Sequence, residues 1–371
     1  MITVEQDRAD HLWMARAVRL AAAVFPPPHP NPRVGCVIVK NGRAIGEGVH
    51  SRAGMPHAEI EALGNCAKSA YGATVYVTLE PCSHFGRTPP CADALIDAGV
   101  QRVVVGHTDP STQGSGRGVA RLRQAGIDVR QGLLEQDARS LNQGFLHRIA
   151  TGLPWVTVKL AASMDGGTAL KSGDSRWITS AQARRDVHWQ RAKAGAIVSS
   201  SATVRVDDPL LNVRLEPELE VEAQPLRVIL DPLLTVPAEA KLFSVAGPLL
   251  IVHGVPAHHV DRDRLAAAGA ELVQLGMAGG GRINLAAMLE LLGKREVNSV
   301  WVEAGSTLAG ELLRLDLVNE LIVYMAPHLL GETAQPLVRL GELENMEQRR
   351  ELYFHDIRRV GEEIKITARP K

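Results

Sequence analysis

The chain has 371 residues, of which 45% are hydrophobic and 22% are charged. This composition is close to the average for folded proteins and excludes a disordered, collagen-like or coiled-coil chain. The 41 basic and 41 acidic residues give a formal net charge of zero, which argues against a protein that grips a long nucleic acid through its phosphates. No apolar run reaches the roughly 18 residues of a membrane span, and the charged N-terminus lacks a secretion signal. We therefore expect a cytoplasmic protein.

The first 150 residues predict a three-layer α/β/α domain with a mixed sheet. Apolar residues at helical spacing over 8–24 predict an opening helix that stops at the proline run 26–28. Asn41-Gly42 between two apolar runs predicts a two-residue hairpin. The elements expected after the first helix are strands at 33–39 and 44–49, a helix from about 57, a strand at 73–79, a helix at 91–98, a strand at 102–106, a helix at 119–126 and a strand at 127–132.

The pattern restarts around 151–154 and predicts a second α/β domain over residues 151–371. A helix is expected over 182–195, and the end of the chain predicts a closing antiparallel pair at 351–360 and 362–369. The other expected strands are 155–161, 196–200, 226–230, 248–253, 271–275, 299–304 and 320–326.

The sharpest chemical signal combines PHAE at 56–59 with PCSHFGRTPPC at 81–91. A zinc deaminase uses one His and two Cys ligands, plus a Glu that carries protons without binding metal. Two thiolates and one imidazole fill three corners of a tetrahedron and leave the fourth for water, whose pKa the zinc lowers. His57 and Glu59 fall in the first turn of one expected helix, and Cys91 falls in the first turn of another. Because residues two apart do not share a helix face, these side chains can converge only on a site beyond the helix ends.

Two other interpretations of the cysteines stay open. A closed structural zinc site would need a fourth protein ligand, and His84 is available for that role. Cys36 lies in an apolar strand and Cys66 late in a helix, so both are interpreted as small buried hydrophobic residues.

The segments HPNPRVGCVIVKNGR, PHAE and TLEPCSHFGRTPPC resemble the cytidine-deaminase superfamily, and within it the bifunctional riboflavin-biosynthesis deaminase–reductase family. Eight residues separate Cys82 from Cys91, as in that branch. The likeness continues through KLAASMDGGTA, SGDSRWITS, QARRDVHWQRAKA, SSATVRVDDPLLNVR and WVEAGSTLAGELL, and is weak only over about 232–296. The resemblance implies a cytidine-deaminase-like domain followed by a dihydrofolate-reductase-like domain.

The activity that the resemblance implies has two steps. The substrate would be 2,5-diamino-6-(ribosylamino)-4(3H)-pyrimidinone 5′-phosphate, which hydrolysis converts to 5-amino-6-(5-phosphoribosylamino)uracil. NADPH would then reduce the ribosyl to a ribityl side chain.

The resemblance also assigns roles in the first domain. One zinc ion per chain would be bound by His57, Cys82 and Cys91, with Glu59 as the proton carrier. Asn31, His50 and Arg87 would contact the substrate. Without the resemblance, Asn31 is a turn residue between two prolines, His50 is an exposed residue at a strand end, and Arg87 is a solvated loop charge.

In the second domain no G-x-G-x-x-G follows a strand, so an ordinary dinucleotide-binding fingerprint is absent. Gly114–Gly118 lies in the first domain and is interpreted as a flexible loop. The small residues at 305–310, directly after a predicted strand, suit a turn whose N–H groups approach phosphates. The residues that the resemblance places at NADPH are Ala161, Trp177, Thr203, Asp207, Gly305, Ser306, Thr307, Leu308, Ala309, Gly310 and Glu311.

The substrate residues implied for this domain are Ser175, Arg191, Leu211, Arg214 and Glu303. Arg191 and Arg214 would clamp the phosphate, and Asp207 or Glu303 would order ribose hydroxyls or assist protonation. The alternatives are core packing for Trp177 and an exposed helix charge for Arg191. Two departures from the family stand out. Pro232 replaces a serine after Asp231, which puts a cofactor contact there in doubt, and Ser306 replaces a proline and suits a helix N-cap.

Two competing functions remain. One is an RNA- or nucleoside-acting zinc deaminase with an unrelated C-terminal domain, and the other is a non-catalytic scaffold folded around zinc. Balanced charge and an aromatic content of 4% argue against a nucleic-acid groove. We expect a small phosphorylated pyrimidine as the substrate, a homo-oligomer, and neither nucleic acid nor membrane as a partner.

Overall fold

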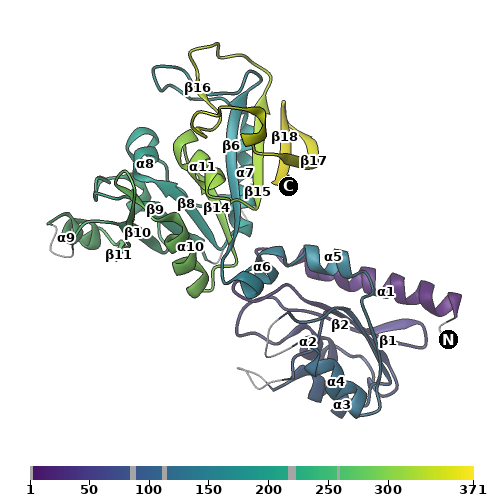
Figure 1. The fold of residues 1–371 in the computed structure, drawn as a ribbon. Helices are drawn as coiled ribbons and strands as arrows, with labels where there is room; N and C mark the ends of the chain where they lie inside the picture. The colour runs from purple at the N-terminus through teal and green to yellow at the C-terminus, as the bar shows by residue number, and fades with distance from the viewer. Residues whose placement is uncertain (1–2, 84–88, 111–114, 216–222, 257–259) are drawn as a thin grey trace. The chain divides into compact units, whose positions relative to one another are not determined.

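The computed structural model describes residues 3–83, 89–110, 115–215, 223–256 and 260–371. By its internal contacts the chain divides into two compact units, Met1–Gly152 and Leu153–Lys371 (Figure 1). The boundary expected from the sequence, between 150 and 151, lies two residues before this division. None of the described helices is long and apolar enough to cross a membrane.

The N-terminal unit is built on a five-stranded sheet with the order β2-β1-β3-β4-β5. Its strands are β1 (Gly35–Lys40), β2 (Arg43–Val49), β3 (Thr74–Leu79), β4 (Arg102–His107) and β5 (Asp128–Gln131). β1 pairs antiparallel with β2 and β3, whereas β3, β4 and β5 run parallel. Asn41 and Gly42 join β1 to β2 with positive φ angles of 51° and 70°, as a two-residue hairpin requires. The predicted hairpin is therefore confirmed.

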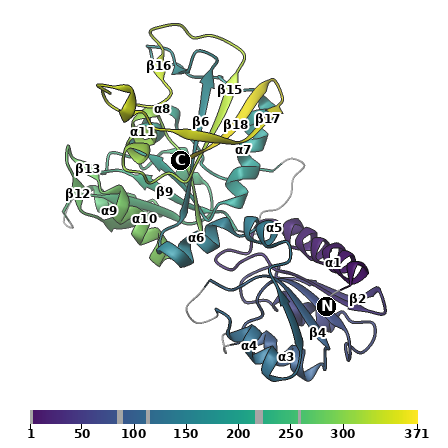
Figure 2. The same cartoon turned by 45° about the vertical axis from the view of Figure 1, so that its right-hand side comes forward.

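Helices cover both faces of this sheet, and Figures 1 and 2 show α1 and α5 on one side with α3 and α4 on the other. The helices are α1 (Val4–Ala23), α2 (Ala58–Gly64), α3 (Cys91–Asp97), α4 (Arg117–Gln124), α5 (Glu135–Ser140) and α6 (Gln143–Thr151). Under α1 the core contains Met14, Val37 and Tyr76, and on the other face it contains Ala62 and Val75. The three-layer α/β/α architecture is thus confirmed, and α5 and α6 are additions that the sequence analysis did not predict.

The C-terminal unit contains a nine-stranded sheet with the order β11-β10-β9-β8-β14-β6-β15-β18-β17. Neighbours from β11 to β15 run parallel, and β18 and β17 form the predicted antiparallel close. Two separate pairs, β12 with β13 and β7 with β16, lie outside this sheet. The strands of the unit are β6 (Trp155–Ser163), β7 (Gly167–Ala169), β8 (Ala196–Ser200), β9 (Leu226–Leu230), β10 (Leu249–His253), β11 (Glu271–Gln274), β12 (Met277–Ala278), β13 (Arg282–Ile283), β14 (Ser299–Glu303), β15 (Glu320–Ala326), β16 (Gln335–Pro336), β17 (Leu352–Val360) and β18 (Glu363–Pro370).

Helices pack on both faces of the large sheet as well. They are α7 (Ala181–Lys193), α8 (Ser201–Asp207), α9 (Val260–Ala267), α10 (Leu285–Lys294) and α11 (Ser306–Arg314), with short 3-10 turns η1 (Lys241–Ser244) and η2 (Met346–Gln348). Leu289 and Leu312 bring α10 and α11 into one core, whereas Val187 and Leu265 bring α7 and α9 into the other. Parallel strands covered on both faces read as apolar runs, which explains why their positions were predictable.

Candidate metal centre and ligand cavity

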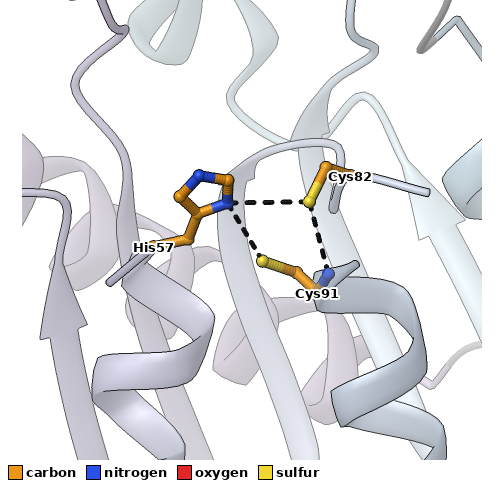
Figure 3. A group of neighbouring side chains, drawn as sticks. All are labelled: His57, Cys82 and Cys91. Carbon is orange, nitrogen blue, oxygen red and sulfur yellow. Dashed lines mark hydrogen bonds between the residues drawn. The ribbon is translucent and has the colours of Figure 1, made fainter. Parts of the chain in front are cut away.

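Three side chains converge beside the ends of two helices of the N-terminal unit (Figure 3). His57 is the N-cap of α2, Cys91 is the first residue of α3, and Cys82 lies in the segment after β3. His57 Nδ1 lies 3.2 Å from Cys91 Sγ and 3.6 Å from Cys82 Sγ. The backbone N–H of Cys91 donates to Cys82 Sγ at 3.3 Å. The predicted residues are therefore brought together at one point.

This cluster fits a zinc ion with one open position. Its three ligand atoms lie within 4.8 Å of one another, and no other such group occurs in the described part of the chain. Hydrogen bonds from the Cys91 thiol and the His57 ring lower the pKa of Cys82 to about 4. The same contact with Cys82, together with burial, raises the pKa of Cys91. One imidazole and two thiols are the donor set of an open zinc site. His84, the alternative fourth ligand, lies outside the described residues.

Glu59 is placed for proton transfer beside this cluster. It is the second residue of α2, and only 3% of it is exposed. Burial raises the pKa of its carboxyl to about 7, against the lowering effects of a backbone hydrogen bond and of His57 and Cys91. A carboxyl that titrates near neutral pH can both accept and donate a proton.

Asn31 and His50, two expected substrate contacts, form a hydrogen-bonded pair. Asn31 Nδ2 lies 2.9 Å from His50 Nε2, and His50 Nδ1 lies 3.0 Å from the carbonyl oxygen of Pro56. The rings of His50 and His57 meet edge-on with centroids 5.4 Å apart. His50 is buried, so its interpretation as an exposed strand end is wrong. Arg87, the third expected contact, lies outside the described residues.

The segment that carries Cys82 is held by the preceding carboxylate, Glu80, which is 5% exposed. Glu80 Oε2 accepts from the backbone N–H groups of Asp109 (3.1 Å) and Gly116 (3.0 Å), and Oε1 accepts from that of Val119 (3.1 Å). A Cβ on Gly118 would lie 1.9 Å from the carbonyl oxygen of Pro81. Arg117 begins α4. Within Gly114–Gly118, residues 115 and 116 therefore form a turn, and Arg117 and Gly118 begin a helix packed on the metal-binding segment, in place of the expected flexible loop.

The remaining two cysteines are packing residues, but only Cys36 is buried as predicted, whereas Cys66 is half-buried. Cys36 is buried in the core of the N-terminal unit and Cys66 packs against it. Burial raises the pKa of both thiols.

The C-terminal unit contains a cavity of about 1160 Å³ with a basic lining. It is walled by β6, α7, α8 and the turn between β14 and α11. Among the described residues, its acidic lining residues are Asp207, Asp208 and Glu303. The basic ones are Lys159, Arg176, Arg184, Arg185, Arg191, Arg214, Lys241 and Arg339. In a chain of zero net charge, this excess of cations favours anionic ligands.

Most of the residues expected at NADPH and at the substrate line this cavity. They are Ala161, Trp177, Thr203, Asp207, Gly305, Ser306, Thr307, Leu308, Ser175, Arg191, Leu211, Arg214 and Glu303. Trp177 is 69% exposed, so the alternative of core packing is wrong. The alternative of an exposed charge for Arg191 is also wrong, since 11% of its side chain is exposed.

Ala309, Gly310 and Glu311 do not line the cavity. Ala309 is buried in the core beneath α11, and a Cβ on Gly310 would lie 2.0 Å from the carbonyl oxygen of Arg339. Glu311 is paired with Arg314. A helix turns away from its first residues within one turn, which explains why a contiguous motif only partly faces the cavity.

The structure also bears on the two departures from the family, Ser306 and Pro232. Gly305 is the N-cap of α11 and Ser306 is its first residue, so Ser306 does not take the N-cap position. Pro232 is not among the residues that line the cavity, and its carbonyl oxygen accepts from the N–H of Gly254 at 3.0 Å.

Arg191 and Glu303 form a pair within the cavity wall. Arg191 donates from Nε (2.5 Å) and Nη2 (2.9 Å) to the two carboxylate oxygens, and Nη1 donates to the carbonyl oxygen of Asn212 at 2.8 Å. Burial alone would raise the pKa of Glu303, but Arg191 lowers it to about 2. The carboxylate thus fixes the direction of the guanidinium.

Lys159 and His188 are among the residues of this wall that were not predicted from the sequence. Burial lowers the pKa of Lys159, which is the one charged residue of β6. A lone lysine in an otherwise apolar strand was the available signal for it. His188 lies in a helix rich in polar residues, where it gives no comparable signal.

Comparisons with known proteins cover nearly the whole chain. Residues 7–107 match the family described as "cytidine and deoxycytidylate deaminase zinc-binding region", and residues 154–366 match "RibD C-terminal domain". The "Riboflavin biosynthesis protein RibD" of Escherichia coli (strain K12) is 47% identical over 365 residues, which cover 96% of this chain and 98% of that protein. The protein of the same name from Haemophilus influenzae is 44% identical and covers 99% of both.

Solved structures agree with this assignment. "Acinetobacter baumannii RibD, form 1" superposes with a TM-score of 0.90 at 41% identity, covering 98% of this chain and 99% of that chain. A diaminohydroxyphosphoribosylaminopyrimidine deaminase/5-amino-6-(5-phosphoribosylamino)uracil reductase from Thermotoga maritima has a TM-score of 0.85 at 30% identity, with coverage of 98% and 99%. The alternative of an unrelated C-terminal domain is thereby excluded. The chain belongs to the RibD family of bifunctional riboflavin-biosynthesis deaminase–reductases.

Proposed function

We propose that the N-terminal unit deaminates the phosphorylated diaminopyrimidinone and that the C-terminal unit reduces the ribosyl group of the product. The observation that carries this proposal is that an open His-Cys-Cys cluster with a buried carboxyl lies in one unit, and a cation-lined cavity in the other. Both substrates of the second step are phosphate esters, which suits the excess of basic residues in that cavity.

In the deamination step, His57, Cys82 and Cys91 would hold the metal. Zinc bound there supplies a water of lowered pKa. Glu59 would accept the proton of this water and deliver it to the ring nitrogen and then to the departing ammonia. The amine carbon gains oxygen and loses ammonia. The Asn31–His50 pair, which lies against the His57 ring, would orient the pyrimidine.

In the reduction step, NADPH supplies a hydride to C1 of the opened ribosylamine in its imine form. The nitrogen of that imine then needs a proton. Lys159 is half-buried in the cavity wall and desolvation lowers its pKa, so we assign the proton transfer to it in place of Asp207 or Glu303. Arg214 and Arg191 would bind the substrate phosphate, and Gly305–Leu308 would contact the cofactor phosphates.

The decisive measurement is a mass spectrum of the product formed from the diaminopyrimidinone phosphate. Without NADPH, we expect the replacement of an amine by oxygen. With NADPH, we expect two further hydrogens. Unchanged substrate with zinc-replete protein would overturn the deaminase assignment, and a product that gains no hydrogens with NADPH would overturn the reductase assignment.

The small pyrimidine substrate follows from the family. Homo-oligomerisation, the lack of a nucleic-acid or membrane partner and the cytoplasmic location stay predictions.

A further inference from the structure

His188 lies on α7 in the cavity wall, three residues before Arg191 on the same side of the helix. Its Nδ1 accepts a hydrogen bond from the backbone N–H of Arg214 at 3.1 Å. Because a backbone N–H can only donate, Nδ1 carries no proton in this arrangement. The fold itself therefore selects the tautomer of the ring.

The ring is neutral, which leaves its single proton on Nε2. Burial and the nearby guanidinium groups of Arg191 and Arg214 lower the pKa of His188 to about 4. Arg214 Nη2 lies 3.3 Å from His188 Nε2. A guanidinium nitrogen also only donates, so two hydrogen-bond donors face each other across this gap.

The surrounding acceptors are already engaged, and the backbone of Asn212 also contacts the His188 ring, where its hydrogen bond acts to raise the pKa against the lowering by burial. The carbonyl oxygen of Asn212 accepts from Arg191 Nη1 at 2.8 Å, and both oxygens of Glu303 accept from Arg191. The side-chain oxygen of Asn212 accepts from Arg214 Nη1. A pair of adjacent donors on a cavity wall is complemented by a ligand atom with several lone pairs.

We propose that His188 Nε2 is a fixed donor to an oxygen of the substrate's 5′-phosphate, shared with Arg214. This inference rests on the proposed reductase function and adds a substrate-binding residue to it. Arg214 supplies charge, whereas His188 supplies a donor whose direction is set by the backbone of residue 214. A phosphate ester offers three acceptor oxygens, so it can satisfy both groups at once.

Two substitutions separate the roles of the two ring nitrogens. His188→Asn retains an acceptor near Nδ1 and removes the Nε2 donor, whereas His188→Gln retains a donor near Nε2. With the zinc-loaded full chain and the deaminated intermediate, we expect His188→Asn to raise KM for that intermediate about tenfold with the KM for NADPH unchanged. We expect His188→Gln to stay within about threefold of the unaltered protein.

Two further readouts address the phosphate. The effect of His188→Asn should vanish when the intermediate lacks its phosphate, and the inhibition constant of inorganic phosphate should rise in this variant. In the unaltered protein, ¹⁵N-histidine spectra should contain a ring with its proton on Nε2 whose Nε2 signal shifts on addition of phosphate. This last readout needs no altered protein to fold.

The failures are distinguishable. If the unaltered protein does not reduce the intermediate, the proposed reductase function fails. If it does, the inference is overturned when His188→Asn leaves KM unchanged, when both variants are impaired equally, or when the phosphate-free intermediate is affected as strongly as the phosphorylated one. A ring that carries its proton on Nδ1 would also overturn it.

Discussion

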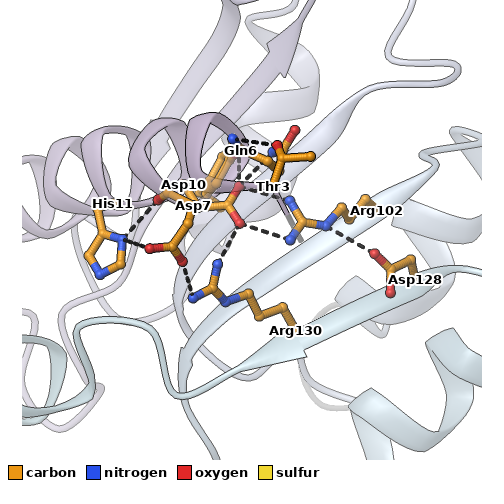
Figure 4. A network of polar contacts seen from close by, with 9 residues as sticks. Thr3, Gln6, Asp7, Asp10, His11, Arg102, Asp128 and Arg130 are labelled. Atoms are coloured by element: carbon orange, nitrogen blue, oxygen red, sulfur yellow. Dashed lines mark hydrogen bonds and ion pairs between the residues drawn. The ribbon is translucent and has the colours of Figure 1, made fainter. Parts of the chain in front are cut away.

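The two units keep their buried charges in different places relative to their sites. In the N-terminal unit, Asp10 on α1 accepts hydrogen bonds from Arg102 Nη1 and Nη2 and from Arg130 Nη1, each at 2.8 Å (Figure 4). It also accepts one from the Tyr76 hydroxyl at 2.9 Å. Tyr76 belongs to the core beneath α1. The metal ligands instead lie at the starts of α2 and α3, which pack on the opposite face of the sheet, and in the segment after β3. The ion network therefore holds the scaffold without touching the site.

In the C-terminal unit one of the enclosed ion pairs is part of the site, whereas others, such as Arg369–Glu320, are not. Arg191 and Glu303 both line the cavity, and the pair is nearly enclosed. The comparison teaches that stability and chemistry can be altered separately at Asp10, and only together at the Arg191–Glu303 pair.

The largest effect is expected from Glu59→Gln. A glutamine cannot accept the proton of water, so we expect the deamination rate to fall about 10²- to 10⁴-fold. Zinc content should stay at one ion per chain, since Glu59 is not a ligand, whereas Cys82→Ser should lose the metal. Product mass spectra and elemental analysis measure the two quantities. Deamination by Glu59→Gln at the unaltered rate would refute the assigned role.

Glu303→Gln should impair both stability and reduction. It leaves the Arg191 guanidinium buried without a counter-charge, which costs about 3–5 kcal/mol of unfolding free energy. We expect a higher KM for the intermediate in reduction and an unchanged deamination rate. Denaturant unfolding measures the loss of stability, and the deamination and reduction assays measure the rate and the KM. A matched control is Glu271→Gln, which removes an exposed carboxylate paired with Arg295 and should cost about 0–1 kcal/mol.

Asp10→Asn should lower stability and leave both activities intact. Losing charged hydrogen-bond partners costs about 1.5–3 kcal/mol. Although burial alone would raise it, hydrogen bonds from Arg102, Gln6 and Tyr76 lower the pKa of Asp10 from its ordinary 3.8 to about 2. Because the pKa of Asp10 is lower in the folded protein, the ionised carboxylate stabilises the fold at pH values above 3.8. This contribution disappears as the pH falls toward 2.

The matched control for this change is Asp128→Asn, because Asp128 pairs with the same Arg102 but is 71% exposed. Hydrogen exchange should show faster opening of β3 to β5 in Asp10→Asn and little change in Asp128→Asn. The pH dependence of unfolding between about 4 and 2 should flatten only in Asp10→Asn. If both variants were destabilised equally, burial of the carboxylate would not be what makes the Asp10 contacts more stabilising than the Asp128 contact.

The contrast also explains how much the sequence predicts. The metal cluster was predictable, because three ligands of unusual type lie in short motifs next to predicted helix starts. The Asn41-Gly42 hairpin was predictable, because two positive φ angles demand those residues. The cavity draws its lining from several elements, so only the family resemblance could assemble it.

The residues that were missed or misjudged share a physical reason. His188 has an ordinary interpretation as a helix residue, and its role depends on the backbone N–H of Arg214, which lies 26 positions away along the chain. Ala309 to Glu311 continue a matching motif, but helical rotation takes them away from the cavity. The position of His50 in the fold, not its residue type, decides that it is buried.

The smallest effect is expected from Glu80→Gln, because Glu80 is not a metal ligand and acts only by holding the segment that carries Cys82. A glutamine amide would present a donor to one of the N–H groups of Asp109, Gly116 and Val119, so the segment that carries Cys82 should lose its fixed position. We expect zinc affinity to fall about tenfold, the lower end for residues that orient metal ligands. Competition with a chelator measures this affinity independently of turnover. Glu135→Gln, at an exposed site on α5, should leave it unchanged. If Glu80→Gln binds zinc as tightly as the unaltered protein, the Cys82 segment is held by Pro81 and Gly118 packing alone, and the site of this unit is even less dependent on buried charge than the comparison implies.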